Sequence, residues 1–283
     1  PMTTRTSIFL CAMLTLAHNG GAGVAVSGSR SIGNAIRGNR IFTNAGLGID
    51  LKADGPFYFP PLAGVTPNDP APDSDKGPNR FQNFPVLTGV AASATGVVVS
   101  GELRSAPEAT FRLDFYANRI RDPSGHGEGE FYLGHFDVTT DAKGVASFQV
   151  NMPAPPAPWI SATATRAGAF ADTSEFSPLV ARPGGQYGVN NTNPSGPGSL
   201  AQAILDSNAS GDPTAVNRIV FDVPGLSSYV ISPTGVMTVT RAVVIDGSTQ
   251  PGATPGTPAV GLDGVAVSGP VLNISGDAVT VRG

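Results

Sequence analysis

Three aspartates in a proline-rich stretch are the residues whose types and spacing best suit metal chemistry. Asp69, Asp73 and Asp75 lie in the segment 68–79, which also contains three prolines. Carboxylate oxygens are the hard ligands that calcium prefers, and the prolines would stiffen the chain around them. The spacing is not that of an EF-hand loop, and a solvated spacer is the alternative interpretation. We therefore predict either a calcium site or a plain spacer at these aspartates.

Catalytic chemistry has weaker support in the sequence. Asp246 and Asp263 could form the carboxylate pair of glycoside cleavage, which requires a separation of about 5 to 10 Å. Each stands beside a glycine, however, so a role in a turn explains both equally well. The three histidines are scattered, no serine occupies a nucleophile-elbow pattern, and Cys11 has no base near it in sequence. We predict no catalytic residue and no bound cofactor other than calcium.

Sugar binding would need an exposed aromatic platform, for which Tyr116, Tyr132 and Trp159 are the candidates. Trp159 lies between a proline and an isoleucine, so packing in a core is the alternative. The glycine-rich segment 125–130 leads into an expected strand instead of a helix, so it lacks the helix N-terminus that would hold phosphate. A long loop is the better interpretation of that segment.

The elements that would position these residues begin with a repeat. Residues 16–26 align with residues 41–51 at an offset of 25, with apolar, Asn and Gly positions matching in type. A fixed period in this range indicates a solenoid, in which Asn and Gly occupy the corners and Asn can stack as a ladder. Asn34, Asn39 and Asn44 stand where such corners are expected. A chance repeat in Gly- and Asn-rich loops is the alternative.

Short β-type runs continue through the middle of the chain. The alternation is clearest at Phe111, Leu113 and Phe115, and about seven strands in about a hundred residues indicate a two-sheet sandwich of the immunoglobulin type. The segment 141–144 is expected to form a hairpin turn, with Gly144 at positive φ.

A short amphipathic helix and more strands follow. Ser199 is the expected N-cap of this helix and Asn208 its end. The helix would cover the first coil of a second solenoid, whose open end exposes backbone and core. The strands are expected at 218–223, 229–231, 237–239, 242–245, 265–267, 271–274 and 278–281.

Composition limits the possible partners. The 283 residues contain 36 Gly and 26 Pro, only 13% are charged, and the formal net charge is −4. This composition favours short strands and turns, and it offers no basic patch for nucleic acid or for an anionic membrane surface. Residues 1–17 are expected to be either a signal peptide, because an apolar run at residues 7–17 follows Arg5, or an atypical coil, because the repeat begins at Leu16. The apolar run is too short to span a bilayer.

These segments resemble the right-handed parallel β-helix repeat proteins of the pectin-lyase-like superfamily. Residues 33–51 look like the last coils of such a solenoid, and 193–200, 219–225 and 245–252 look like the start of another. The motifs 113–118, 122–130 and 173–177 are similar to a β-sandwich module that follows such solenoids. The superfamily contains polysaccharide lyases and hydrolases as well as members without assigned chemistry, so the fold alone does not choose an activity.

The expected fold class is therefore all-β, with an immunoglobulin- or fibronectin-III-like sandwich flanked by partial right-handed parallel β-helix segments and one capping helix. The expected divisions are terminal β-helix coils at 1–51, a Pro/Asp-rich linker at 52–83, the sandwich at 84–181 and a second, helix-capped β-helix at 182–283.

The leading functional hypothesis is a non-catalytic structural or adhesive module of a large bacterial surface or secreted protein. Its partners would be an extracellular polysaccharide or a surface protein, without nucleic acid and without insertion into a membrane. The alternatives are a piece of a β-helix polysaccharide lyase or glycoside hydrolase, and a carbohydrate-binding sandwich. Both ends of the chain are expected to be interior sequence of something longer.

Overall fold

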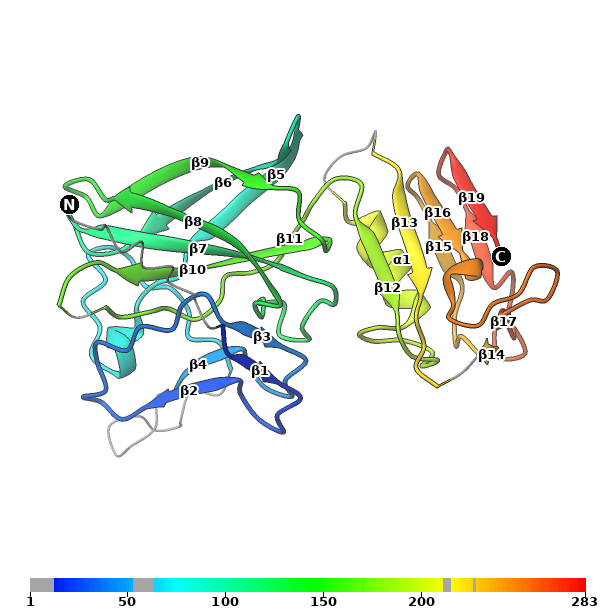
Figure 1. The fold of residues 1–283 in the computed structure, drawn as a ribbon, viewed down its shortest axis with the longest axis horizontal. Helices are drawn as coiled ribbons and strands as arrows, with labels where there is room; N and C mark the ends of the chain where they lie inside the picture. Colours follow the sequence, from blue (N-terminus) through cyan, green and yellow to red (C-terminus); the bar gives the residue numbers. More distant parts are fainter. Residues whose placement is uncertain (1–12, 53–63, 170, 211–214, 226–227) are drawn as a thin grey trace, which may run out of the picture.

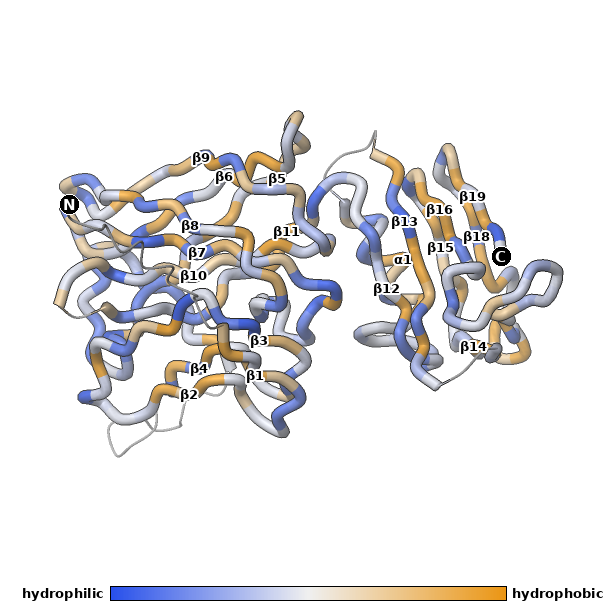
Figure 2. The backbone as a smooth tube through the Cα atoms, in the orientation of Figure 1, coloured by the Kyte–Doolittle hydropathy of each residue, from blue (hydrophilic) through white to orange (hydrophobic). Residues whose placement is uncertain are grey.

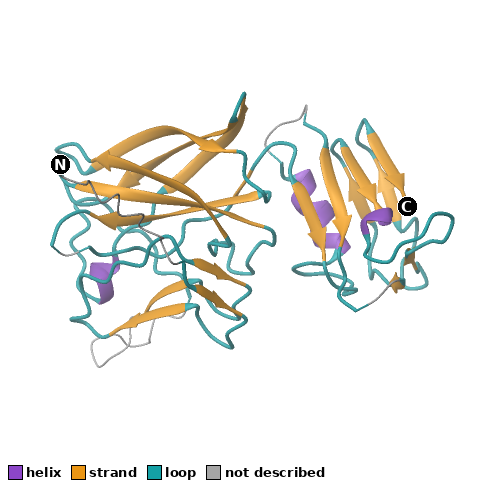
Figure 3. Cartoon of the chain, viewed as in Figure 1, coloured by secondary structure: helices purple, strands orange, loops and turns teal. Residues whose placement is uncertain are grey.

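The protein is an all-β chain with one short α-helix. The computed structural model describes residues 13–52, 64–169, 171–210, 215–225 and 228–283. Strands are the main regular elements of that range, and α1 (Leu200–Asn208) is the α-helix within it (Figures 1 and 3). Among these residues, no helix combines the length and the apolar character that crossing a bilayer requires. The expectation of an all-β fold is confirmed.

The N-terminal residues form two layers of parallel strands, which we call the first parallel stack (residues 13–52). Leu16 lies opposite Ile41 and Val24 lies opposite Ile49, so the pairing follows the offset of 25 residues that the sequence predicts. The strands are β1 (Thr15–Ala17), β2 (Val24–Ser27), β3 (Arg40–Phe42) and β4 (Ile49–Lys52). Residues 15–17 belong to this parallel pairing as β1. Residues 1–12, where the question of a signal peptide lies, are outside the described residues.

Glycines let the two layers approach each other. A Cβ atom on Gly23 would lie 2.6 Å from Ile41 Cγ2 and 2.8 Å from the carbonyl oxygen of Gly48. Both distances are shorter than real Cβ contacts, so Gly23 has a steric cause, whereas Gly21, at the neighbouring repeat position, has open space around it. The side chains of Ile41, Ile49 and Leu51 are buried between the layers and the rest of the protein.

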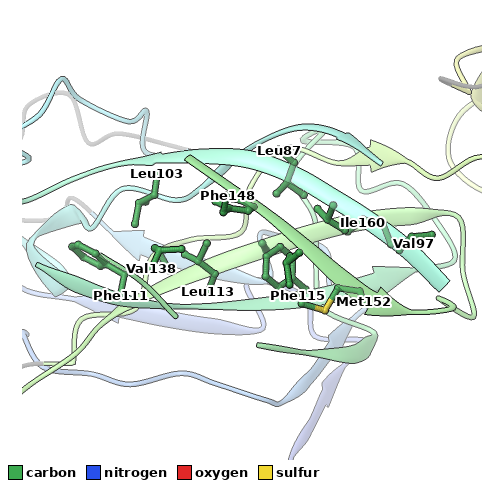
Figure 4. Packing of buried hydrophobic residues seen from close by; sticks show 14 of the residues in the cluster. Leu87, Val97, Leu103, Phe111, Leu113, Phe115, Val138, Phe148, Met152 and Ile160 are labelled. Carbon is green, nitrogen blue, oxygen red and sulfur yellow. The ribbon is translucent and has the colours of Figure 1, made fainter. Parts of the chain in front are cut away.

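Two antiparallel sheets follow, which we call the two-sheet unit (residues 86–181). One sheet has the order β5-β6-β9 and the other has the order β11-β10-β7-β8. The strands are β5 (Val86–Ser93), β6 (Gly96–Arg104), β7 (Thr110–Asn118), β8 (Phe131–Thr139), β9 (Val145–Pro153), β10 (Trp159–Arg166) and β11 (Val180–Ala181). Phe111, Leu113 and Phe115 point from β7 toward Phe148 of β9 in one shared apolar core (Figure 4). The alternation along β7 is thus confirmed as the pattern of a strand with one face in a core.

The other face of β7 and β10 is buried as well. Asp114 on β7 and Ser161 and Thr163 on β10 have no exposed surface, although the alternating pattern places them opposite the apolar core. The first parallel stack lies beneath this sheet (Figure 1). A polar face that the sequence pattern assigns to solvent is therefore an internal interface of the molecule.

The turn at residues 141–144 is confirmed, but it does not form a hairpin. The N–H of Gly144 donates to the carbonyl of Asp141, and Gly144 has a φ of 77°. The flanking strands belong to different sheets, because β8 pairs with β7 whereas β9 pairs with β6. The local signal for a turn was correct, and the pairing of the two strands was wrong because partner choice is decided by the shared core.

Residues 64–83, the described part of the predicted linker, pack against their neighbours. The 3₁₀ segment η1 (Pro78–Phe81) contains Asn79, which is fully buried, and Phe81, which joins the core of the first parallel stack. Asn79 has a φ of 44°, a left-handed conformation that asparagine tolerates better than most residues.

A second set of parallel strands completes the chain, which we call the second parallel stack (residues 186–282). Its main sheet has the order β12-β13-β16-β19, and β14 pairs with β17 and β15 with β18, all in parallel. The elements are β12 (Gln186–Val189), β13 (Asn217–Phe221), β14 (Tyr229–Ile231), β15 (Met237–Val239), β16 (Val243–Asp246), η2 (Gly247–Thr249), β17 (Val260–Leu262), β18 (Leu272–Ile274) and β19 (Val279–Arg282). Apolar residues recur along its strands (Figure 2).

The helix is as the sequence predicts, whereas one strand is not. The Ser199 hydroxyl accepts the N–H of Gln202 at 3.1 Å, and the apolar face of α1 joins the core of the second stack. The strand expected at 265–267 is a loop in which Val265 is 87% exposed. The strand β17 lies instead at Val260–Leu262, because it must pair with β14.

Candidate functional site: the junction that closes the first parallel stack

An asparagine ladder runs down one corner of the first parallel stack. The backbone N–H and the Nδ2 group of Asn19 both donate to Asn44 Oδ1, at 3.1 and 2.7 Å. A second corner shows the same geometry, since the backbone N–H and Nδ2 of Asn34 both donate to Asn79 Oδ1, at 3.0 Å each. Each asparagine thereby satisfies two donors of the layer above, which is the arrangement that the predicted corner positions imply.

The two-sheet unit accepts the last hydrogen bonds of the first asparagine ladder. The backbone N–H and Nδ2 of Asn44 both donate to Glu128 Oε1, at 3.1 and 2.7 Å. These distances equal those between Asn19 and Asn44, so the Glu128 carboxylate takes the same position relative to Asn44 that Asn44 takes relative to Asn19. Glu128 lies in the loop between β7 and β8, in the glycine-rich segment that the sequence correctly assigns to a long loop.

The segment 172–177 closes a second part of the same layer. Glu175 accepts the backbone N–H of Leu51 on Oε1 at 2.9 Å and that of Thr66 on Oε2 at 2.8 Å. Asp172 accepts the N–H of Gly33 and forms an ion pair with Arg80. The orphan donors along the edge of β4 and the neighbouring loop therefore find acceptors from the two-sheet unit, as buried backbone groups require.

Backbone pairing and packing complete the junction. Ile41 and Gly129 exchange two hydrogen bonds, of 2.9 and 2.7 Å, in an antiparallel bridge. The ring of Phe176 rests against Gly48, where an added Cβ would lie 2.8 Å from the ring. The junction therefore combines a closed apolar contact with satisfied polar groups.

Burial raises the pKa of two of these acids. Desolvation raises the pKa of Glu128 to about 6, although the hydrogen bonds from Asn44 oppose the shift. Desolvation likewise raises the pKa of Glu175 to about 7, against the hydrogen bonds from Leu51 and Thr66. The two carboxylates accept hydrogen bonds from the first parallel stack, but ionising them in this desolvated environment is costly.

The aspartates of the predicted calcium site lie apart from this junction. Asp73 Oδ2 accepts hydrogen bonds from Ser105 Oγ and Gln82 Nε2, at 2.5 and 3.2 Å. Burial raises the pKa of Asp73 to about 6, with smaller contributions from Asp69 and Asp75. Across the described ranges, no group of three or more His, Cys, Asp or Glu side chains is placed to hold a metal ion. Calcium at these aspartates stays a prediction.

The two aspartates considered for glycoside cleavage, Asp246 and Asp263, make hydrogen bonds and ion pairs with neighbouring residues. Arg218 and Arg282 both donate to Asp246 Oδ2 at 2.7 Å and hold the pKa of that carboxyl far below its usual range. Asp263 accepts the N–H of Val265 in a turn. The expected turn geometry agrees with this contact of Asp263. It also agrees with Asp246, which precedes η2 and accepts the hydroxyl of Ser248 on Oδ1, in addition to its two ion pairs.

The aromatic candidates do not form an exposed platform. Tyr116 is 2% exposed and Trp159 is 4% exposed. Tyr132 is half-buried, and its hydroxyl donates to Asp114 Oδ1 at 2.9 Å. The expectation that these three residues could form an exposed sugar-stacking surface is therefore wrong, because Tyr116 and Trp159 are buried.

Sequence reasoning missed the residues that form the junction, which are Asn79, Glu128, Asp172 and Glu175. A usable signal was present for two of them, because Glu128 follows a glycine and Glu175 follows a serine in two of the three motifs that resemble the sandwich module. Neither the models of known protein families nor the curated proteins give a match to this chain.

Proposed function

We propose that this chain is a non-catalytic structural and adhesive module of a large secreted or cell-surface bacterial protein. In this proposal the parallel stacks are pieces of right-handed β-helix that provide length, and the immunoglobulin-like two-sheet unit joins them. The parallel pairing at an offset of 25 residues supports the solenoid interpretation.

The observation that carries the proposal is the position of Glu128. An open solenoid end presents unpaired backbone and core side chains, which must be covered to prevent association with other chains. Glu128 repeats the two hydrogen bonds of the asparagine ladder, and Glu175 accepts the N–H groups at β4. This arrangement supports a two-sheet unit that acts as the terminal cap of one solenoid.

The helix α1 has the corresponding position at the start of the second stack. Leu200, Ala203 and Ile204 are buried in the same core as β12, β13 and β15. Trp159 of β10 belongs to that core too, and its ring lies 6.0 Å from that of Tyr187. The two-sheet unit therefore contacts both stacks through side-chain packing, which suits a connector.

Hydrogen exchange of single amides tests the capping role. In the full chain, Glu128→Ala removes the acceptor of the Asn44 N–H, so exchange of that amide should accelerate strongly while the Asn19 amide changes little. Glu130→Ala is the matched control, because Glu130 lies in the same loop and its carboxylate pairs with Arg119, whereas its contact with Arg40 of the first parallel stack is through the backbone carbonyl, which the substitution keeps. Equal exchange of Asn44 in the two variants would contradict the proposal.

A catalytic role is the alternative, as a piece of a polysaccharide lyase or hydrolase. The ion pairs of Asp246 do not suit a general acid, because they favour the ionised carboxylate. Incubation of the chain with pectic and alginate polysaccharides, followed by ultraviolet absorbance and reducing-end assays, tests this alternative. Product formation would overturn the non-catalytic proposal.

A further inference from the structure

A cleft separates the two-sheet unit from the second parallel stack. Its volume is about 660 Å³, within the range of roughly 300 to 1,000 Å³ that small-ligand sites occupy. One wall is formed by the β7–β8 loop together with Phe42 and Asn44 of the first stack, and the other wall by β12, β13 and the residues after them. The lining residues come from both of the bodies that stand left and right in Figure 1.

Two polar side chains of this cleft have no hydrogen-bond partner among the described residues. Gln186 stands at the start of β12 and Asp222 directly after β13, both exposed on the same wall, and their side chains make no hydrogen bond within that part of the chain. On the facing wall, the guanidinium of Arg121 lies 5.7 Å from the Trp159 ring centroid. An amide, a carboxylate acceptor and a guanidinium donor thus border one volume.

The lining is chemically mixed. Phe42, Pro123 and Val220 contribute apolar surface beside the polar groups. A sugar ring presents apolar C–H faces and hydroxyl groups that both donate and accept, which matches such a lining better than a wholly apolar ligand does.

The charge of the cleft lining favours neutral sugars over acidic ones. Four carboxylates line the cleft, whereas Arg119 and Arg121 are its two cations, and Arg119 is already paired with Glu130. The acidic lining residues are Asp122, Glu128, Glu130 and Asp222. An excess of negative charge disfavours an acidic sugar through like-charge repulsion.

We propose that this cleft binds a short segment of a neutral polysaccharide, with Gln186, Asp222 and Arg121 as its hydrogen-bonding residues. The site goes beyond the structural role proposed above and gives the adhesive part of that role a location. It does not depend on the aromatic platform that the sequence suggested.

Trp159 provides a reporter within the protein. It is the only tryptophan, and Arg121 lies against its ring. A ligand that engages the Arg121 guanidinium should change the emission of Trp159, because the cation is part of the indole's surroundings.

The test is titration of the full chain with neutral trisaccharides, followed by tryptophan emission and calorimetry. Cellotriose, xylotriose, maltotriose and chitotriose are the probes, and trigalacturonate is the acidic comparison. At least one neutral probe should bind saturably, and trigalacturonate should bind at least about tenfold more weakly. Gln186→Ala and Asp222→Ala should each weaken binding by about tenfold, the effect of one lost hydrogen bond.

Gln149→Ala on β9 and Asp277→Ala before β19 are matched controls, because both residues are exposed and neither lines the cleft. The proposal is overturned if no neutral probe binds at millimolar concentration, if trigalacturonate or a polar tripeptide binds more tightly, or if the cleft and control variants bind alike. Amide exchange at Asn44 reports the capping role separately, so failure of the cleft and failure of the cap are distinguishable.

Discussion

Replacing Glu128 by glutamine should stabilise the protein near neutral pH and leave its stability unchanged in acid. The amide oxygen of glutamine can accept the N–H and Nδ2 of Asn44, as the amide oxygen of Asn44 does for Asn19. What the substitution removes is the cost of ionising a carboxyl in a desolvated position.

The direction of this change in stability with pH follows from the pKa of Glu128 in the unfolded and the folded protein. Burial raises the folded pKa of Glu128 from 4.5 to about 6, so the folded state keeps a proton that the unfolded state has released. Stability is therefore fully present below the unfolded pKa and decreases as the pH rises through the folded value. A shift of about 1.5 pKa units at about 1.4 kcal/mol per unit gives roughly 2 kcal/mol, an upper figure for a side chain in contact with some solvent.

Urea unfolding of both proteins from about pH 4 to about pH 8 measures this difference. The free energies of unfolding should coincide near the acid end and diverge by up to about 2 kcal/mol at the alkaline end, with glutamine the more stable. Glu102→Gln is the control, because Glu102 lies on β6 outside the junction and pairs with Arg104. A difference that does not depend on pH, or a loss of stability near pH 8, would refute the reasoning.

Three further predictions concern single groups. Gly48→Ala should lower the free energy of unfolding by about 1 to 3 kcal/mol, because the new methyl group would overlap the Phe176 ring. Gly20→Ala is the control in thermal unfolding and should have little effect, because Gly20 has open space around it. The Glu175 carboxyl should titrate near pH 7 in carbon-detected NMR, and a midpoint near the ordinary glutamate value would contradict its burial. If calcium binds at the predicted aspartates, it should give calorimetric heat and raise the melting temperature, and chelation should reverse both; silence in both measurements would exclude the site.

Much of the local structure could be predicted from the residues alone. Short sequence patterns predicted the offset of 25 residues, the corner asparagines and the helix that begins after Ser199. They could do so because steric fit, turn geometry and capping act between residues that are close in the chain or in register. The strand β7 was equally clear from alternation. The error at Val265 has the same origin, since an apolar triplet indicates a strand only if a partner strand is available.

The junction was decided by tertiary structure. Glu128 reaches Asn44 across 84 positions and Glu175 reaches Leu51 across 124, and no local pattern encodes which acceptor will complete a ladder. The same applies to the second buried face of β7 and β10, whose polar side chains would face water in an isolated sheet. The sequence by itself determined the 25-residue repeat and the positions of most strands, because these depend on periodicity. Only the tertiary structure decided which strands pair in the two-sheet unit and how the first parallel stack ends, because an open layer of backbone donors can be satisfied by any acceptor that the rest of the chain brings within hydrogen-bonding distance.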